Sequence, residues 1–175
     1  LSTDKFLEDI LSGTSGDIAW SLNSEFLFYV LRDPETLLPF KVYRHKLGDN
    51  QSKDILVYEE RDNTFNVSVG NTRSMKYVEI NISSTTSSES LFINSSSPKE
   101  KPKSIFKREK DHLYSVEDDR NRLLIMTNWE AQNFRLIETN LEESLDKSKW
   151  REIIPHRDDV LLQSFLAYPS KIVLL

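Results

Sequence analysis

The 175-residue sequence contains no cysteine and only four glycines. Without cysteine, the chain can have no disulfide framework, no thiolate metal ligand and no thiol nucleophile. Four glycines are too few for a Gly-rich turn repeat, and neither of the phosphate-binding patterns G-x-x-x-x-G-K-[ST] and G-x-G-x-x-G occurs. The absence of cysteine also fits a reducing compartment, and we expect a cytoplasmic protein.

Clustered positive charge and membrane-length apolar runs are missing as well. Lys and Arg total 23 against 28 Asp and Glu, for a formal net charge of −5. This balance argues against a protein that tracks nucleic-acid phosphates, which needs clustered basic residues. The N-terminus has no basic-then-apolar signal pattern. We therefore expect neither nucleic acid nor membrane as a partner, and 38% hydrophobic residues indicate a soluble globular chain.

Short apolar segments recur along the chain with a period of about 48 residues. The last segment of each unit falls at 55–58, 104–107 and 152–155. Three segments precede it in each unit, at 17–21, 26–30 and 40–47, at 65–69, 76–82 and 89–94, and at 112–116, 122–126 and 133–141. Polar and apolar residues alternate within them, which favours strands over helices. Four short strands repeated at this period are typical of a propeller blade.

The sequence therefore predicts an all-β fold, a partial β-propeller of about three four-stranded antiparallel blades plus part of a neighbouring blade. The expected blades are 17–62, 63–110 and 111–158, followed by the start of a truncated blade at 159–175. Residues 1–16 are expected to end a preceding blade or to form a linker, with 5–11 as a strand or short helix. The chain starts at Leu1 and ends in an apolar run, so we expect a longer polypeptide at both ends. Open blade faces would also allow self-association.

Strand order predicts which loops share one end of the blades. In a four-stranded meander, the loop from strand two to strand three and the connection to the next blade leave at the same end. The connections to the next blade are the charged clusters 59–62, 108–111 and 156–159, and the other loops are 32–39, 83–88 and 128–132. This composition suits a polar interface with another domain or partner. The alternative is that these loops are charged only because they are solvated.

Catalytic machinery is not evident in the sequence. A serine hydrolase needs a nucleophile on a G-x-S-x-G elbow, with His and Asp brought to it, and no such elbow occurs. The three histidines, His45, His112 and His156, are not at metal-ligand spacing and are expected to be structural or surface residues. We predict that this chain contains no catalytic residue, no metal site and no cofactor.

Several stretches of the sequence resemble those of one known protein family. They are 33–45 with Leu47-Gly48 and 54–60 after it, together with 83–89, 110–116, 154–157 and the T-N-x-x-A-x-N-x-R-L pattern at 127–136. These residues resemble the propeller of the prolyl oligopeptidase family of serine peptidases, and within it the oligopeptidase B (protease II) group. The resemblance covers residues 17–175.

The resemblance implies a seven-bladed propeller that caps a C-terminal α/β-hydrolase domain, the expected partner, and admits short peptides while excluding folded proteins. It also implies cleavage after Arg or Lys, recognised mainly by acidic residues of the hydrolase domain. No residue of this chain matches the family's nucleophile, catalytic Asp or catalytic His. In that family the propeller meets the hydrolase domain through the loops grouped above.

Two functional hypotheses remain. The first is a non-catalytic propeller portion of a serine-type oligopeptidase that gates substrate access by size. The second is a free-standing propeller that acts as a protein-interaction module. For the first, we expect the gating face at Arg32, Asp33, Glu60, Asp62, Asn128 and an exposed Trp129. Its ion pairs would be exposed or half-exposed, each worth ~0.2–1 kcal/mol, and thus weak enough to open and close.

Overall fold

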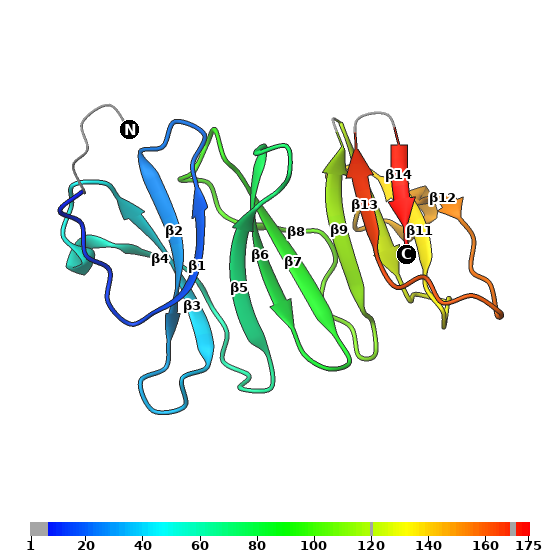
Figure 1. Ribbon diagram of the computed structural model, residues 1–175, viewed down its shortest axis with the longest axis horizontal. Helices are drawn as coiled ribbons and strands as arrows, with labels where there is room; N and C mark the ends of the chain where they lie inside the picture. Colours follow the sequence, from blue (N-terminus) through cyan, green and yellow to red (C-terminus); the bar gives the residue numbers. More distant parts are fainter. Residues whose placement is uncertain (1–6, 120, 169–170) are drawn as a thin grey trace.

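The computed structural model describes residues 7–119, 121–168 and 171–175, which form antiparallel sheets in chain order (Figure 1). The first sheet consists of β1 (Thr14–Trp20), β2 (Phe26–Arg32), β3 (Pro39–Lys46) and β4 (Ile55–Glu59). The second consists of β5 (Asn66–Asn71), β6 (Tyr77–Ser83), β7 (Ser88–Asn94) and β8 (Lys103–Ser104). The third consists of β9 (Tyr114–Asp119), β10 (Arg122–Thr127), β11 (Arg135–Thr139) and β12 (Arg151–Ile154).

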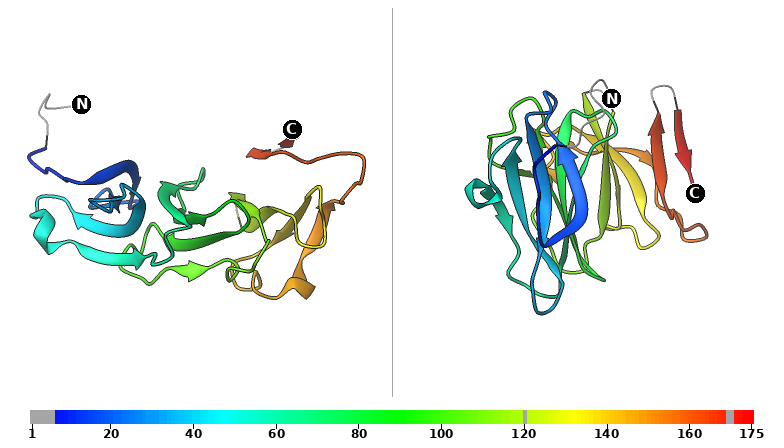
Figure 2. Two further views of the ribbon diagram at one scale, coloured as in Figure 1. Left: turned by 90° about the horizontal axis from the view of Figure 1, so that it is seen from below. Right: turned by 60° about the vertical axis from the view of Figure 1, so that its left-hand side comes forward.

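A hairpin of β13 (Phe165–Tyr168) and β14 (Lys171–Leu174) follows the third sheet. The sheets stand side by side in a row, and the chain folds back at its end so that the hairpin covers the third sheet (Figure 2). The predicted all-β fold with three four-stranded antiparallel sheets and part of a fourth is confirmed. The exact blade boundaries stay a prediction. No helix in the described residues is long and apolar enough to cross a membrane.

The sheets stand in a row because the inner sheets carry apolar side chains on both faces. Along β10, Leu123 and Ile125 pack toward the second sheet, while Leu124 and Met126 pack toward the hairpin. Successive residues of a strand point to opposite faces, so a continuous apolar run marks a strand that is buried on both sides. β6 and β7 follow the same rule, with Ile80 facing the first sheet and Phe92 the third.

The turns repeat as well as the strands. Two short 3₁₀ helices, η1 (Gln51–Lys53) and η2 (Lys147–Lys149), both lie between the third and fourth strands of their sheets. Asn50 accepts a hydrogen bond from the amide of Ser52, and Asp146 accepts one from the amide of Ser148. These two capping residues lie two repeat lengths apart, so the internal repeat extends to the chemistry of the turn.

Three local expectations were wrong. The last strand of the second sheet stops at Ser104, because Ile105 and Phe106 turn inward and become fully buried between the second and third sheets. The strand expected from residue 160 begins only at Phe165, because Leu162 packs on the third sheet and its amide bonds to Asn133. Residues 7–11 form neither strand nor helix, and residues 5 and 6 lie outside the described residues.

Replacing Ile80 by Ala tests the packing between the first two sheets. Ile80 is fully buried there, so we expect a loss of about 2–5 kcal/mol in the free energy of unfolding, measured in urea. Ile55 lies on β4 with 54% of its surface exposed, and Ile55→Ala should cost less than about 1 kcal/mol. Equal costs for the two variants would contradict the assignment of the core.

Candidate functional site

The loops β2–β3, β4–β5, β6–β7 and β10–β11 all leave the sheets at one end, which is the lower end in Figure 1. A groove of about 480 Å³ opens there beside the first sheet. Its lining consists of Asp33, Thr36, Leu38, Phe40, Glu59, Glu60, Arg61, Asp62, Asn63 and Phe65. The groove therefore has apolar walls, four carboxylates and one guanidinium. It brings together three of the six predicted gating residues, Asp33, Glu60 and Asp62.

Asp33 holds the β2–β3 loop in shape. Its Oδ1 accepts hydrogen bonds from the amides of Glu35 and Thr36, at 3.0 and 2.8 Å, and from the Thr36 hydroxyl at 3.0 Å. These bonds to the charged form, the Thr36 amide first, lower the pKa of Asp33 below its ordinary value. The carboxylate therefore stays ionised at the mouth of the groove.

Asp62 has the same role in the β4–β5 loop. Its Oδ1 accepts from the hydroxyl and the amide of Thr64, at 2.7 and 3.0 Å. The hydroxyl and then the amide lower the pKa of Asp62. The side chain lies in an exposed stretch of the loop, so it also presents a fixed negative charge to solvent.

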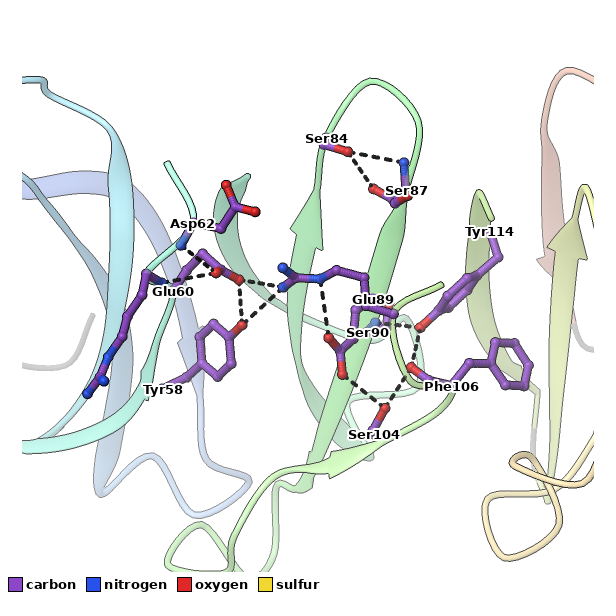
Figure 3. A network of polar contacts seen from close by, with 12 residues as sticks. Tyr58, Glu60, Asp62, Ser84, Ser87, Glu89, Ser90, Ser104, Phe106 and Tyr114 are labelled. Atoms are coloured by element: carbon purple, nitrogen blue, oxygen red, sulfur yellow. Dashed lines mark hydrogen bonds and ion pairs between the residues drawn. The ribbon is translucent and has the colours of Figure 1, made fainter. Parts of the chain in front are cut away.

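Glu60, between these two, is buried with only 8% of its surface exposed. Its Oε1 accepts from the amides of Arg61 and Asp62, and its Oε2 accepts from the Tyr58 hydroxyl at 2.8 Å and from Arg108 (Figure 3). Burial alone would raise the pKa of Glu60, but the bonds from Arg108, Asp62 and Tyr58 outweigh it and leave the pKa lowered. The expectation of an exposed, loosely held ion pair is therefore wrong for Glu60.

Arg108 joins the first sheet to the second. It comes from the β8–β9 connection and pairs with Glu60, while its Nε lies 3.6 Å from Oε2 of Glu89 on β7. Its guanidinium also lies 3.7 Å from the centre of the Phe65 ring. Glu89 in turn accepts from the Ser104 hydroxyl at 3.2 Å (Figure 3). The groove wall at Glu60 is thus fixed from the neighbouring sheet.

Asn128 and Trp129 belong to a second group, beside the third sheet. Asn128 accepts from the Leu113 amide at 2.8 Å and donates to the Asp111 carbonyl at 3.0 Å, so it ties two loops together. Nζ of Lys147 lies 2.9 Å from the centre of the Trp129 ring and 2.8 Å from Oε1 of Glu109. Trp129 was expected to be exposed, and this is wrong, because Lys147 covers the half-buried ring.

The remaining predicted residue, Arg32, does not line the groove. It donates to the Ser15 carbonyl at 3.1 Å and so ties the end of β2 to β1. Arg108 and Lys147 were not among the predicted site residues, although Arg108 lies in one of the charged clusters. Nothing in the local sequence distinguishes these residues from solvated lysines and arginines, because their partners lie 48 and 38 positions away.

His112 is enclosed in the protein interior and has a structural role. His112 is 2% exposed, its Nε2 lies 2.8 Å from the Thr127 hydroxyl, and burial followed by the charge of Lys147 lowers its pKa. Within the described ranges, no three His, Asp or Glu side chains are placed to hold a metal ion.

Comparison with known proteins identifies the family. The family model for the prolyl oligopeptidase N-terminal β-propeller domain matches residues 1–175. The chain belongs to the prolyl oligopeptidase family. It is 36% identical over 170 residues to dipeptidyl aminopeptidase BI of Pseudoxanthomonas mexicana, covering 94% of this chain and 23% of the relative. It is 30% identical over 176 residues to protease 2 of Moraxella lacunata, covering 99% of this chain and 25% of the relative.

Solved structures of the family have the same fold. Oligopeptidase B from Leishmania major matches with a TM-score of 0.83 at 29% identity, covering 93% of this chain and 23% of that one. Oligopeptidase B from Trypanosoma brucei, in a closed form with covalently bound antipain, matches with a TM-score of 0.84 at 29% identity, covering 94% and 23%. The resemblance to the N-terminal propeller portion of this family is therefore confirmed. The chain spans about a quarter of the length of the curated relatives it matches.

Removing the charge of Glu60 tests the link between the sheets. We expect Glu60→Gln to lower the free energy of unfolding at neutral pH by about 1–3 kcal/mol, because Arg108 loses its buried partner. The pKa of Glu60 is lowered in the folded state. Its contribution is therefore present above its ordinary value of 4.5 and is lost as pH falls through the lowered value, where the variant and the parent should converge.

Arginine substitutions provide the matched comparison in the same urea titrations. Arg108→Met should cost about as much as Glu60→Gln. Arg61→Met should cost less than about 1 kcal/mol, because the Arg61 side chain is 87% exposed and pairs with the nearby Glu59 at the surface. If Arg61 mattered as much as Arg108, the assignment of Arg108 as the link would fail.

Proposed function

We propose that this chain is a non-catalytic part of the propeller of a serine-type oligopeptidase that hydrolyses short peptides. In this proposal, the groove end faces a C-terminal α/β-hydrolase domain, and the loops there limit the access of longer substrates. The observation that carries the proposal is the groove itself. It sets two fixed, ionised carboxylates, Asp33 and Asp62, at the end of the sheets where family resemblance implies the contact.

The residues of the groove divide into two roles. Glu60 is a positioning residue, because its carboxylate is enclosed by Tyr58, Arg108 and two backbone amides of its own loop. Asp33 and Asp62 keep one side open to solvent, so they are the groups that can form and break ion pairs with a facing basic residue. Exposed pairs of this kind are weak enough for a gate, at ~0.2–1 kcal/mol each.

The proposal also includes a substrate preference and a cellular location for the parent protein. Cleavage after Arg or Lys is supported by the resemblance to oligopeptidase B in sequence and in fold. Another relative with higher identity is named a dipeptidyl aminopeptidase, so the substrate preference of the parent protein is a separate question for experiment. A cytoplasmic location is supported by the lack of cysteine.

The gating role is tested in the whole peptidase that contains this chain. Asp33→Asn and Asp62→Asn remove the charges while keeping the oxygens that accept the loop hydrogen bonds. With fewer ion pairs to close the gate, we expect kcat/KM for a long peptide to rise roughly two- to fivefold relative to that for a dipeptide reporter.

Asp146→Asn is the matched control. Asp146 caps η2 through the amide and hydroxyl of Ser148, as Asp62 caps its loop through Thr64, but it lies outside the groove. It should leave the ratio of the two substrates unchanged. Equal effects of the groove variants on long and short substrates would reject the size filter and leave the interaction module as the better hypothesis.

A further inference from the structure

A buried histidine lies on the face of the first sheet that points away from the second. His45, on β3, is 1% exposed and takes no part in the groove. Its Nδ1 lies 2.7 Å from Oδ1 of Asp54, which follows η1. Its Nε2 lies 2.9 Å from Oδ1 of Asp9, in the segment that leads into β1. The imidazole is therefore held between two carboxylates from different parts of the chain.

This geometry requires a particular charge state. A neutral imidazole has only one N–H, so in either tautomer one ring nitrogen would turn a lone pair toward a carboxylate oxygen less than 3 Å away. Both contacts are favourable only when both ring nitrogens carry a proton. Asp9 cannot easily supply a proton instead, because hydrogen bonds from His45 and from the Gly48 amide lower its pKa. Asp54 also accepts a bond, at 2.9 Å, from the Tyr29 hydroxyl.

The segment held by His45 has few other attachments. We call residues 9–12 the strap; it lies beside η1 and the turn before it, and it is dark blue in Figure 1. Asp9 binds His45 and the Gly48 amide, and Ser12 exchanges two backbone hydrogen bonds of 3.1 Å with the Gln51 side chain. Ile10 is 81% exposed and adds little apolar burial, whereas Leu11 is half-buried. The polar contacts of Asp9 and Ser12 therefore contribute much of the attachment of the strap.

We propose that His45 is a pH-operated latch, in which the imidazolium holds the strap against the first sheet and loss of its proton releases Asp9. The other titratable groups around it are Tyr29, Tyr43, Lys53 and Asp49. Burial raises the pKa of Tyr29 to about 12, and Tyr43 stacks on Tyr29 at 5.8 Å. Lys53 and Asp49, on the η1 loop, pair with each other at 3.6 Å.

The direction of the pH effect follows from the two partners. Burial alone would lower the pKa of His45, but the bonds to Asp9 and Asp54 and their charges raise it above its ordinary value of 6.5. The latch is therefore fully closed below that value and opens as pH rises through the raised pKa. On the acid side, the pKa of Asp9 lies below its ordinary value of 3.8, so the latch also opens as pH falls through that lowered value.

Hydrogen exchange of the full chain tests the latch directly. After correction for intrinsic exchange, the strap amides should exchange faster on the alkaline side of the His45 titration than at mildly acid pH. The expected ratio of the two exchange rates is about tenfold for each unit by which the pKa of His45 in the latched state exceeds its pKa in the released state.

Proton NMR of the imidazole identifies the group responsible. His45 should titrate above 6.5, and Asp9→Asn should lower that pKa and remove the pH dependence of strap exchange. His156→Gln is the control. The His156 imidazole makes a long contact, 3.8 Å, with the exposed carboxylate of Asp158, so this substitution should change neither result. Titration of His45 at or below 6.5 in the parent chain, or equal strap exchange on both sides of the titration, would overturn the proposal.

Discussion

The second and third sheets are covered on both faces, and the rest of the structure depends on that constraint. Leu123 and Ile125 need the second sheet, and Leu124 and Met126 of the same strand need the hairpin. Burial of apolar area drives this stacking but is non-directional, so it does not by itself set how one sheet lies on the next. The meander within each sheet then puts alternate loops at opposite ends, and this places the groove.

Polar side chains that form hydrogen bonds between neighbouring sheets set how one sheet is aligned on the next. Asn71 binds both the amide and the carbonyl of Trp20, at 2.7 and 2.8 Å, between the first and second sheets. Ser88 does the same to Tyr114, at 2.7 and 3.0 Å, between the second and third. Asn133 binds the carbonyls of Arg157 and Asp158 beyond the third. The contacts of Asn71 and Ser88 are buried or partly buried, and a buried polar group left without its partner costs more than a bond gains, so these two contacts favour one alignment.

The charged groups of the chain fall into classes that differ in burial. Glu60 with Arg108 and His45 with Asp9 are enclosed and join segments distant in sequence, and Asp54 holds His45 from the other side. Asp33 and Asp62 are held by their own loops and keep their charges available to a facing surface. A rigid wall carrying exposed charges is the arrangement that a reversible contact between domains needs, since the loops need not be reordered each time the contact forms.

The sequence by itself determined the repeat, most of the strands, the loops that share an end and the family. These depend on local alternation, on turn residues such as Asn50 and on motifs within a few tens of residues, all of which are read along the chain. Only the tertiary structure decided that Glu60 is buried by Arg108, that Lys147 covers Trp129 and that Asp9 reaches His45. A charged residue in a loop has the same local signature whether it is solvated or enclosed. Its partner is set by the stacking of whole sheets, which brings together side chains that no sequence spacing connects.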